Sequence, residues 1–366
     1  MQIMANTSVS PLSMERAPWP LNDRFKSDWE RLLQTARYTS PFDYLEWIES
    51  GIACFAKGEI MPCRFFDTDG TLRAMGMLRI SEEPGKLLPR TVVRSIDYNS
   101  QRILPLLASD IPTLAEAMRT LVASVDFPVD SFDFFKLDEL GGSIKEVSTL
   151  LKRKGVPHSL EVFNEQPFFP LTGTWKEYLS ERTQGHRKRI RRYTRKLWER
   201  YPDYTFQRYQ SEEDFADRDF ESVLHEIFGL YDKSWQADAL SKDDALHDLK
   251  GFYRNIATVF LPKGMLDLCT LHADHTLLAF ELNLCTKSAV YMLFGSYNRD
   301  YSDWSPGNAI LSEILQDSYT KGYDRVEFGG EFLDYKKLWT KSTVKSFHLR
   351  LHGNTLKAKI KRVISR

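Results

Sequence analysis

The sequence has 366 residues, of which 42% are hydrophobic and 13% aromatic, and its formal net charge is zero. This length and composition predict an ordinary globular chain with two domains, each large enough to bury a core of its own. The sequence has no apolar run of about 18 residues, which excludes a spanning helix. Its first residues have no apolar stretch of the signal-peptide type, so we expect a loose leader over residues 1–25 on a cytoplasmic protein.

The charges are unevenly spread. Residues 181–200 carry nine Lys or Arg against two Glu, and residues 336–366 carry ten against no acid. This asymmetry predicts an anionic partner for the second half of the chain, which is a cofactor phosphate, a nucleic acid or a membrane surface.

The cysteines predict neither a disulfide framework nor a metal site. Cys54, Cys63, Cys269 and Cys285 lie far apart, without the spacing of metal ligands. Most of them stand among apolar residues, where a reduced thiol behaves as a small hydrophobe.

Helical and strand patterns alternate in the first half. The spacing of apolar residues predicts helices over 43–55, 111–125 and 142–155, and strands over 62–66, 72–80 and 131–137. This alternation is typical of a layered α/β domain, which we place at residues 26–170. Three prolines in residues 156–174 mark its boundary and predict an edge strand of its sheet.

The second domain, residues 171–366, begins with a long helical pattern from Trp175. Ile190, Tyr193 and Leu197 share one predicted face of this pattern, and Arg187, Arg191 and Arg195 form a basic stripe on another. A solvated helix and an anion-binding helix both explain the stripe. A strand over 204–209, helices over 220–235 and 245–260, and strands over 266–272, 277–285 and 289–297 follow.

Residues 289–330 read as strand, turn-rich loop, helix over 308–319 and strand over 325–329. A Ser-Pro-Gly turn at the start of a helix can bind a phosphate through free backbone N–H groups and the positive helix end. Ser305 followed by Pro306 also fits an ordinary N-cap, so both interpretations stay open.

Three motifs of the second half together resemble one protein family. They are WKEYLSERTQGHRKRIRRYTRKL at 175–197, MLFGSYNRDYSDWSPGNAILSEILQDSYTKGYDRVEFGG at 292–330 and DYKKLW at 334–339. The chain is similar to the GNAT superfamily, and within it to the FemAB-like and CelD-like (cellulose-biosynthesis) acetyltransferases. Residues 42–50, FDYLEWIES, also resemble a segment of this group. The resemblance implies tandem GNAT-like domains of the α/β class, with a mixed central sheet flanked by helices and a degenerate N-terminal half.

The resemblance implies acyl transfer from a carrier to an amine or hydroxyl. We expect acyl-CoA as co-substrate, no metal, and an acceptor that is a small molecule or an envelope or polysaccharide precursor. Trp304 stands where the GNAT loop usually has Arg or Gln, which leaves aminoacyl-tRNA open as the alternative carrier. A non-catalytic binding scaffold is the second alternative.

Candidate site residues follow from the matching positions. Glu281, a carboxylate on a hydrophobic strand, is the first candidate for a general base, although a solvated strand position would also explain it. Tyr297 is the candidate for a catalytic hydroxyl. The carrier phosphates are assigned to Ser305, Gly307, Asn308 and Ala309, and the substrate to Arg189, Tyr291, Glu331, Asp334, Tyr335, Lys336 and Trp339.

Two further segments have less specific interpretations. Cys269 and His272 are close in sequence, but a covalent route through them is less favoured because both fall on one predicted strand. The basic helix predicted over 355–366 either touches an anionic membrane or packs on its own domain.

Overall fold

The structure is a computed structural model that describes residues 10–36, 39–55, 57–85, 88–96, 106–138, 143–234, 248–356 and 358. The chain divides into two compact units. Unit 1 comprises Met1–Ile52, Ala56–Glu165 and Val344–Arg366, and unit 2 comprises Ala53–Phe55 and Gln166–Thr343. The sequence-based division placed residues 344–366 in the second domain. The structure groups them with unit 1, because the strand that contains Val344 pairs there.

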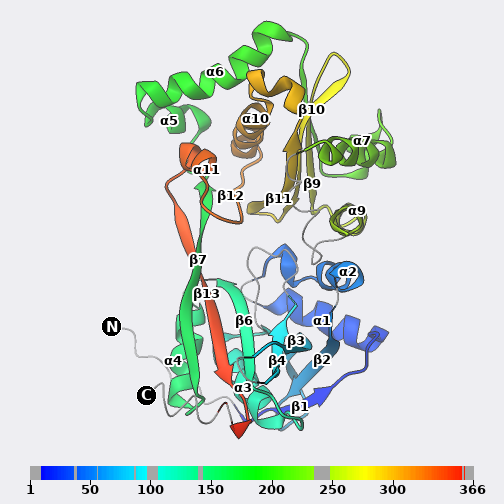
Figure 1. Ribbon diagram of the computed structural model, residues 1–366, viewed down its shortest axis with the longest axis vertical. Helices are drawn as coiled ribbons and strands as arrows, with labels where there is room; N and C mark the ends of the chain where they lie inside the picture. Colours follow the sequence, from blue (N-terminus) through cyan, green and yellow to red (C-terminus); the bar gives the residue numbers. More distant parts are fainter. Residues whose placement is uncertain are drawn as a thin grey trace. The chain divides into compact units, whose positions relative to one another are not determined.

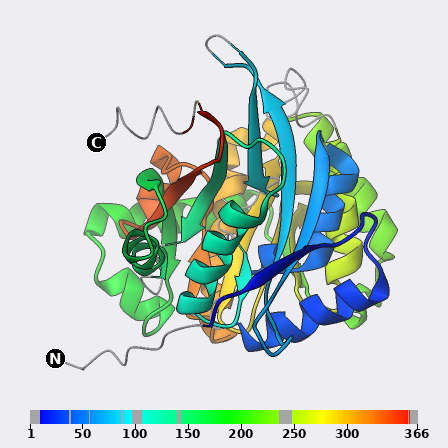
Figure 2. The same ribbon diagram turned by 90° about the horizontal axis from the view of Figure 1, so that it is seen from below.

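Unit 1 is built on a mixed sheet. Its strand order is β1 (Ser13–Arg16), β2 (Glu59–Phe66), β3 (Leu72–Glu83), β4 (Arg90–Ser95), β6 (Ser131–Asp138) and β13 (Thr343–His352), with β5 (Leu107–Ala108) paired to β3. Only β4 and β6 are parallel among these described neighbours. The α-helices are α1 (Asp23–Thr35), α2 (Leu45–Phe55), α3 (Ile111–Ser124) and α4 (Ser143–Arg153), of which α3 and α4 lie side by side (Figure 2).

The stretch predicted as a loose leader is partly ordered. Residues Ser13–Arg16 form β1, which pairs antiparallel with β2 from Ser13 opposite Phe66 to Arg16 opposite Cys63. Helix α1 begins inside the same stretch, because the Asn22 side chain caps it by accepting from the Phe25 N–H at 2.9 Å. The leader prediction was therefore wrong for these residues, and residues 1–9 lie outside the described part.

Unit 2 is built on a second mixed sheet. Its strand order is β7 (His158–Pro170), β12 (Arg325–Glu327), β11 (Ala289–Tyr297), β10 (Thr276–Cys285), β9 (Leu266–Ala273) and β8 (Thr205–Tyr209). The helices are α5 (Trp175–Ser180), α6 (Gln184–Arg200), α7 (Phe220–Asp232), α9 (Leu249–Phe260), α10 (Pro306–Thr320) and α11 (Asp334–Trp339), with 3-10 turns η2 (Glu212–Phe215) and η4 (Arg299–Trp304). Helix α10 covers one face of the sheet, and α7 and α9 cover the other (Figure 1).

The two halves repeat one element order. Among the described α-helices and strands, from β1 to β7 and again from β8 to β13, a strand and two helices precede three antiparallel strands, a helix, a parallel strand, another helix and a last strand. The last strands are exchanged, since β7 pairs with β12 and β13 pairs with β6. In the first half the counterpart of β11 is divided between β4 and β5. The predicted class, tandem α/β units with mixed sheets flanked by helices, is confirmed.

Strand β7 is not the edge strand that its prolines predicted. It lies between β13 and β12 in the strand order, and Arg325 pairs with Pro170. Proline fits here because its carbonyl still accepts, as the bond from the Phe328 N–H to the Pro167 oxygen at 3.0 Å shows.

Most predicted elements of the second half are confirmed, with one break. The long helix from Trp175 is divided into α5 and α6, because the Thr183 side chain caps α6 by accepting from the His186 N–H. Ile190, Tyr193 and Leu197 are buried as predicted. The predictions for Trp235, for residues 245–247 and for most of the C-terminal basic helix lie outside the described residues.

A buried polar network ties the sheet of unit 2 to α10. The Arg208 guanidinium donates to both Asp267 oxygens at 2.6 and 3.0 Å, and to Asp317 at 2.8 Å. Asp267 also accepts from Gln210 and Asn283, and it is completely buried. Such a pair tolerates burial because each charge is satisfied by charge-assisted hydrogen bonds.

No described helix combines the length and apolarity that crossing a membrane requires.

Candidate active site

Strands β11 and β12 separate soon after they meet. Their parallel pairing is limited to three residue pairs, from Ala289 opposite Arg325 to Tyr291 opposite Glu327. Strand β12 then ends, whereas β11 continues to Tyr297 while it remains paired with β10 on its other edge. In the described part of the chain, β12 therefore offers no partner to the second half of β11, and the sheet opens there.

The Glu281 side chain lies over β11 beside this opening. Glu281 of β10 pairs with Gly295 of β11, and a Cβ built on Gly295 would stand 2.2 to 2.4 Å from the three carboxylate atoms of Glu281. A side chain at position 295 would take the space of the carboxylate and displace it, so glycine here lets Glu281 lie over β11. Just after Glu281, the pairing of β10 with β11 shifts its register between Leu282 and Asn283. Such irregularities change the direction in which nearby side chains point.

Lys336 supplies a cation near this carboxylate. Its ammonium, carried by α11, donates to the Gly329 carbonyl at 2.5 Å and to the Glu331 carbonyl at 3.1 Å. Gly329 and Gly330 both have left-handed backbone, with φ of 57° and 56°, so the chain turns sharply just after β12. Lys336 is buried, which fixes its ammonium beneath that turn.

Burial shifts the pKa values of the Glu281 carboxyl and the Lys336 ammonium toward each other. It raises the pKa of Glu281 to about 8, and the nearby Lys336 charge opposes part of this rise. Burial lowers the pKa of Lys336 to about 8 against the opposing charges of Glu281 and Glu331. A carboxylate with a raised pKa that keeps part of its surface accessible can accept a proton near neutral pH.

The start of α10 differs from an ordinary N-cap. Ser305 is left-handed, with φ of 54°, and its side chain does not cap the helix. The N–H groups of Asn308 and Ala309 both donate to the Ser305 carbonyl at 3.0 Å. Of the predicted phosphate donors, only the Gly307 N–H has no acceptor among the described residues. Gly307 packs on the Tyr297 ring, and a Cβ built on this glycine would lie 3.2 Å from the nearest ring atom.

Trp304, which departs from the usual GNAT loop, has a packing role. Its ring lies 5.8 Å from those of Tyr201 and Tyr301, measured between centroids. The Lys196 ammonium of α6 also donates to the Asp303 carbonyl at 3.1 Å. Aromatic and polar contacts from α6 therefore hold the loop that precedes α10.

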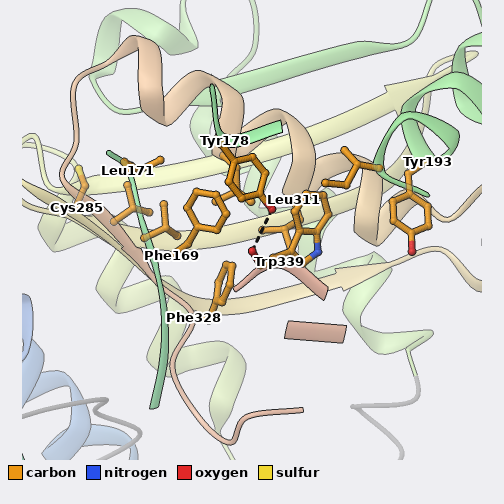
Figure 3. Packing of buried hydrophobic residues seen from close by; sticks show 12 residues of the cluster. Phe169, Leu171, Tyr178, Tyr193, Cys285, Leu311, Phe328 and Trp339 are labelled. Carbon is orange, nitrogen blue, oxygen red and sulfur yellow. Dashed lines mark hydrogen bonds between the residues drawn. The ribbon is translucent and has the colours of Figure 1, made fainter. Parts of the chain in front are cut away.

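The motifs at residues 175–197 and 334–339 meet in a hydrophobic cluster. Trp339 is completely buried, and its carbonyl accepts from the Tyr178 hydroxyl at 3.0 Å (Figure 3). Tyr178 stacks on Trp175 and packs edge-on against Phe169. Trp339 therefore fixes α11, and with it Lys336, from within the core.

Replacing Tyr178 with phenylalanine should lower the free energy of unfolding by about 1 kcal/mol, because the ring packing stays and one hydrogen bond is lost. Urea unfolding measures the change, and Tyr335→Phe, at an exposed ring, is the control. Equal stability of the Tyr178 variant and the native chain would contradict this role.

The other substrate-binding candidates lie in different surroundings, some buried or close to Glu281 and some exposed to solvent. Burial of the Tyr335 hydroxyl, although the ring is half exposed, raises its pKa, and the nearby Glu281 charge adds to the rise. Tyr291 is buried, and the Glu331 carbonyl bonds to Lys336. Asp334 points into solvent beside Lys337, and Arg189 is exposed on α6. The structure thus brings Glu281, Tyr335 and Lys336 together, but leaves Asp334 and Arg189 in solvent.

Cys269 is a buried free thiol whose pKa burial raises well above its ordinary value, which disfavours the nucleophilic thiolate. The other three cysteines are also free and buried. Among the described residues, no three His, Cys, Asp or Glu side chains gather as metal ligands would.

Sequence reasoning missed Gly295 and the glycine turn at Gly329 and Gly330. A glycine inside an apolar strand is a signal of close approach, and it could have indicated the space for Glu281. Nothing in the local sequence indicates that the Lys336 ammonium bonds to the carbonyls of that turn.

Comparison with known proteins identifies the second unit. A family model described as an acetyltransferase (GNAT) domain matches residues 184–337. The fold is similar to that of FemX, with a TM-score of 0.58 and 11% identity over 96% of this chain and 100% of that one. No similar sequence was found among curated proteins.

Two further similar structures share this fold. One is the C-terminal domain of a putative lysylphosphatidylglycerol synthetase from Agrobacterium fabrum (TM-score 0.54, 12% identity, 93% of this chain and 95% of that one). The other is L-PGS from Bacillus licheniformis (TM-score 0.51, 12% identity, 90% and 98%). The CelD-like grouping stays a prediction. Residues 184–337 thus match a GNAT acetyltransferase domain, and the chain as a whole has a fold similar to that of FemX.

Proposed function

We propose that the protein transfers an acyl group from acyl-CoA to an amine or hydroxyl of a small molecule or of an envelope or polysaccharide precursor. The observation that carries the proposal is the Glu281 carboxylate, with its pKa raised to about 8, beside the opening between β11 and β12. Lys336 lies near enough for its charge to act on this carboxylate.

In the proposed step, the acceptor nitrogen or oxygen forms a bond to the thioester carbonyl carbon while Glu281 takes its proton. The tetrahedral intermediate then expels the CoA sulfur as a thiolate, which takes the proton held by Glu281 and leaves as the free thiol. As Glu281 becomes neutral on taking the proton, the nearby Lys336 ammonium is proposed to stabilise the oxyanion of the tetrahedral intermediate. Tyr335 and Tyr297 are the hydroxyls proposed to line this path.

The Gly307 N–H and the start of α10 are proposed to bind the carrier's phosphate. Two observations support this placement. The Gly307 N–H lacks an acceptor among the described residues, and the contact between Gly307 and the Tyr297 ring fixes the start of α10 against the end of β11. Tyr297 is the last residue of β11, the strand that borders the opening.

Replacing Gly307 with tryptophan should abolish binding of acyl-CoA thioesters in calorimetry, because the new side chain meets the Tyr297 ring and so displaces the start of α10, where the phosphate is proposed to bind. Gly229→Trp, at an exposed helical glycine with open space around it, is the matched control. Unchanged affinity in the Gly307 variant would remove the phosphate assignment.

Aminoacyl-tRNA is the alternative donor, and Trp304 in the loop before α10 keeps it under consideration. A panel of CoA thioesters and charged tRNAs, assayed for binding and for turnover, distinguishes the two. Acyl-CoA turnover supports the proposal, and turnover of charged tRNA alone supports the alternative. A chain that binds and turns over neither would be a scaffold.

A further inference from the structure

Helix α6 exposes many cations and few compensating acids. Lys188, Arg191, Arg192 and Arg195 occupy its outer side, and we call these four residues the cationic face of α6. The exposed residues Arg189, Lys196 and Arg200 continue the charge around one flank. Among the described residues, the ion pair that reaches the cationic face joins Arg195 to Glu199 at 3.4 Å, and both partners are exposed.

The rest of α6 is fixed to the domain. Ile190, Tyr193 and Leu197 are buried in the two cores of unit 2, on the opposite side of the helix. The Arg187 guanidinium donates to the carbonyls of Ser180 at 3.0 Å and Arg182 at 2.8 Å, which fastens the turn between α5 and α6. The cationic face is therefore held outward on a rigid support, and its like charges repel one another.

An aromatic side chain flanks the cationic face. The Trp198 side chain is 58% exposed and lies one turn beyond Arg195. Tryptophan next to basic residues is typical of surfaces that meet the headgroup region of a bilayer. A single exposed tryptophan is ordinary on a protein surface, but beside four cations the Trp198 ring would add a contact with the headgroup region.

We propose that the cationic face of α6, together with Trp198, docks unit 2 on an anionic phospholipid surface. Charge complementarity supports this occupant, since the face has four cations and one exposed acid beside it. A nucleic-acid strand is less well matched. Stacking needs several exposed aromatic rings, whereas Tyr193 and Tyr201 at the same helix are turned into the core.

The contact would be peripheral. The apolar face of α6 is already packed against α10 and its neighbours, so it is not available for insertion (Figure 1). Because Lys196 bonds to the Asp303 carbonyl, docking would also place the loop before α10 close to the headgroups. This inference goes beyond the proposed transfer reaction and does not depend on it.

Co-sedimentation of the full chain with vesicles tests the inference. We expect binding to vesicles that contain phosphatidylglycerol and phosphatidylcholine in a ratio of about 1 to 2, weak binding to pure phosphatidylcholine, and a strong decrease as salt rises. The triple variant Arg191→Gln, Arg192→Gln, Arg195→Gln should lose roughly 100-fold in partitioning, since each basic residue contributes about fivefold. Trp198→Ala should weaken binding less.

The matched control removes three exposed cations of unit 1, as Lys152→Gln, Arg153→Gln, Lys345→Gln. Circular dichroism confirms that each variant is folded. Equal loss in the control and α6 variants, or equal binding to neutral and anionic vesicles, would overturn the inference. Binding of unacylated tRNA that the α6 substitutions abolish, without vesicle binding, would assign the face to nucleic acid instead.

Discussion

Replacing Glu281 with glutamine should lower the rate of acyl transfer by about 10²- to 10⁴-fold, the usual contribution of a general base. Glutamine keeps the shape that fits over Gly295 but cannot take a proton. In the native chain, the carboxylate form of Glu281 increases as the pH rises toward its pKa of about 8, whereas the Lys336 ammonium is lost as the pH rises above its own pKa of about 8, so kcat/KM should pass through a maximum near that pH. The variant should lose the rising limb of this profile. Steady-state kinetics from pH 6 to pH 10 measure both effects.

The matched control is Glu213→Gln, which removes an exposed carboxylate from the same unit. It should leave both the rate and the pH profile unchanged. If the Glu281 variant kept a rate within a few-fold of the native chain, another group or water would be the base. Gly295→Ala tests the position of the Glu281 carboxylate, because the new methyl group displaces the carboxylate without removing it. This variant should also lower the rate of acyl transfer.

Replacing Asp267 with alanine should lower the free energy of unfolding by about 3 to 5 kcal/mol. The substitution removes the buried carboxylate that accepts two bonds from the buried Arg208 guanidinium and leaves it only the partly exposed Asp317 as a charged partner, and a buried charge that loses its buried partner is strongly destabilising. Asn283 and Gln210 lose an acceptor as well. Urea unfolding followed by circular dichroism measures the change.

Glu199→Ala is the matched control, because it breaks the exposed ion pair with Arg195. Exposed pairs contribute little, so its effect should stay within about 0.5 kcal/mol. A small effect of Asp267→Ala would show that water or Asp317 compensates Arg208. The double change of Arg208 and Asp267 to methionine and leucine should recover part of the loss, since it removes both charges.

Periodicity predicted the strands that build the site but not how they separate. The spacing of apolar residues indicated β9, β10 and β11 within one or two residues, because these strands are buried and bounded by turns. The place where β11 and β12 separate depends on the left-handed Gly329 and Gly330 and on α11, which are tertiary features. No local pattern contains that information.

The candidate site was predicted in part. Glu281 was found because a carboxylate on an apolar strand needs an explanation, and the structure gives it a raised pKa. Trp339 and Tyr178 were recognised through motifs, yet the structure shows that they pack against each other in the core. Motif resemblance identifies residues that matter without separating those that support the site from those that would touch a substrate.

The exchanged last strands affect how the chain can be divided. A fragment that begins after Pro170 would lack the strand that covers β12 and would keep a β13 whose partner β6 is missing. A fragment that ends at Pro170 would carry β7 without its partner β12 and would leave β6 uncovered. Uncovered strand edges invite intermolecular pairing. Each sheet therefore takes a strand from each half of the chain, and we expect neither half to fold as an independent module.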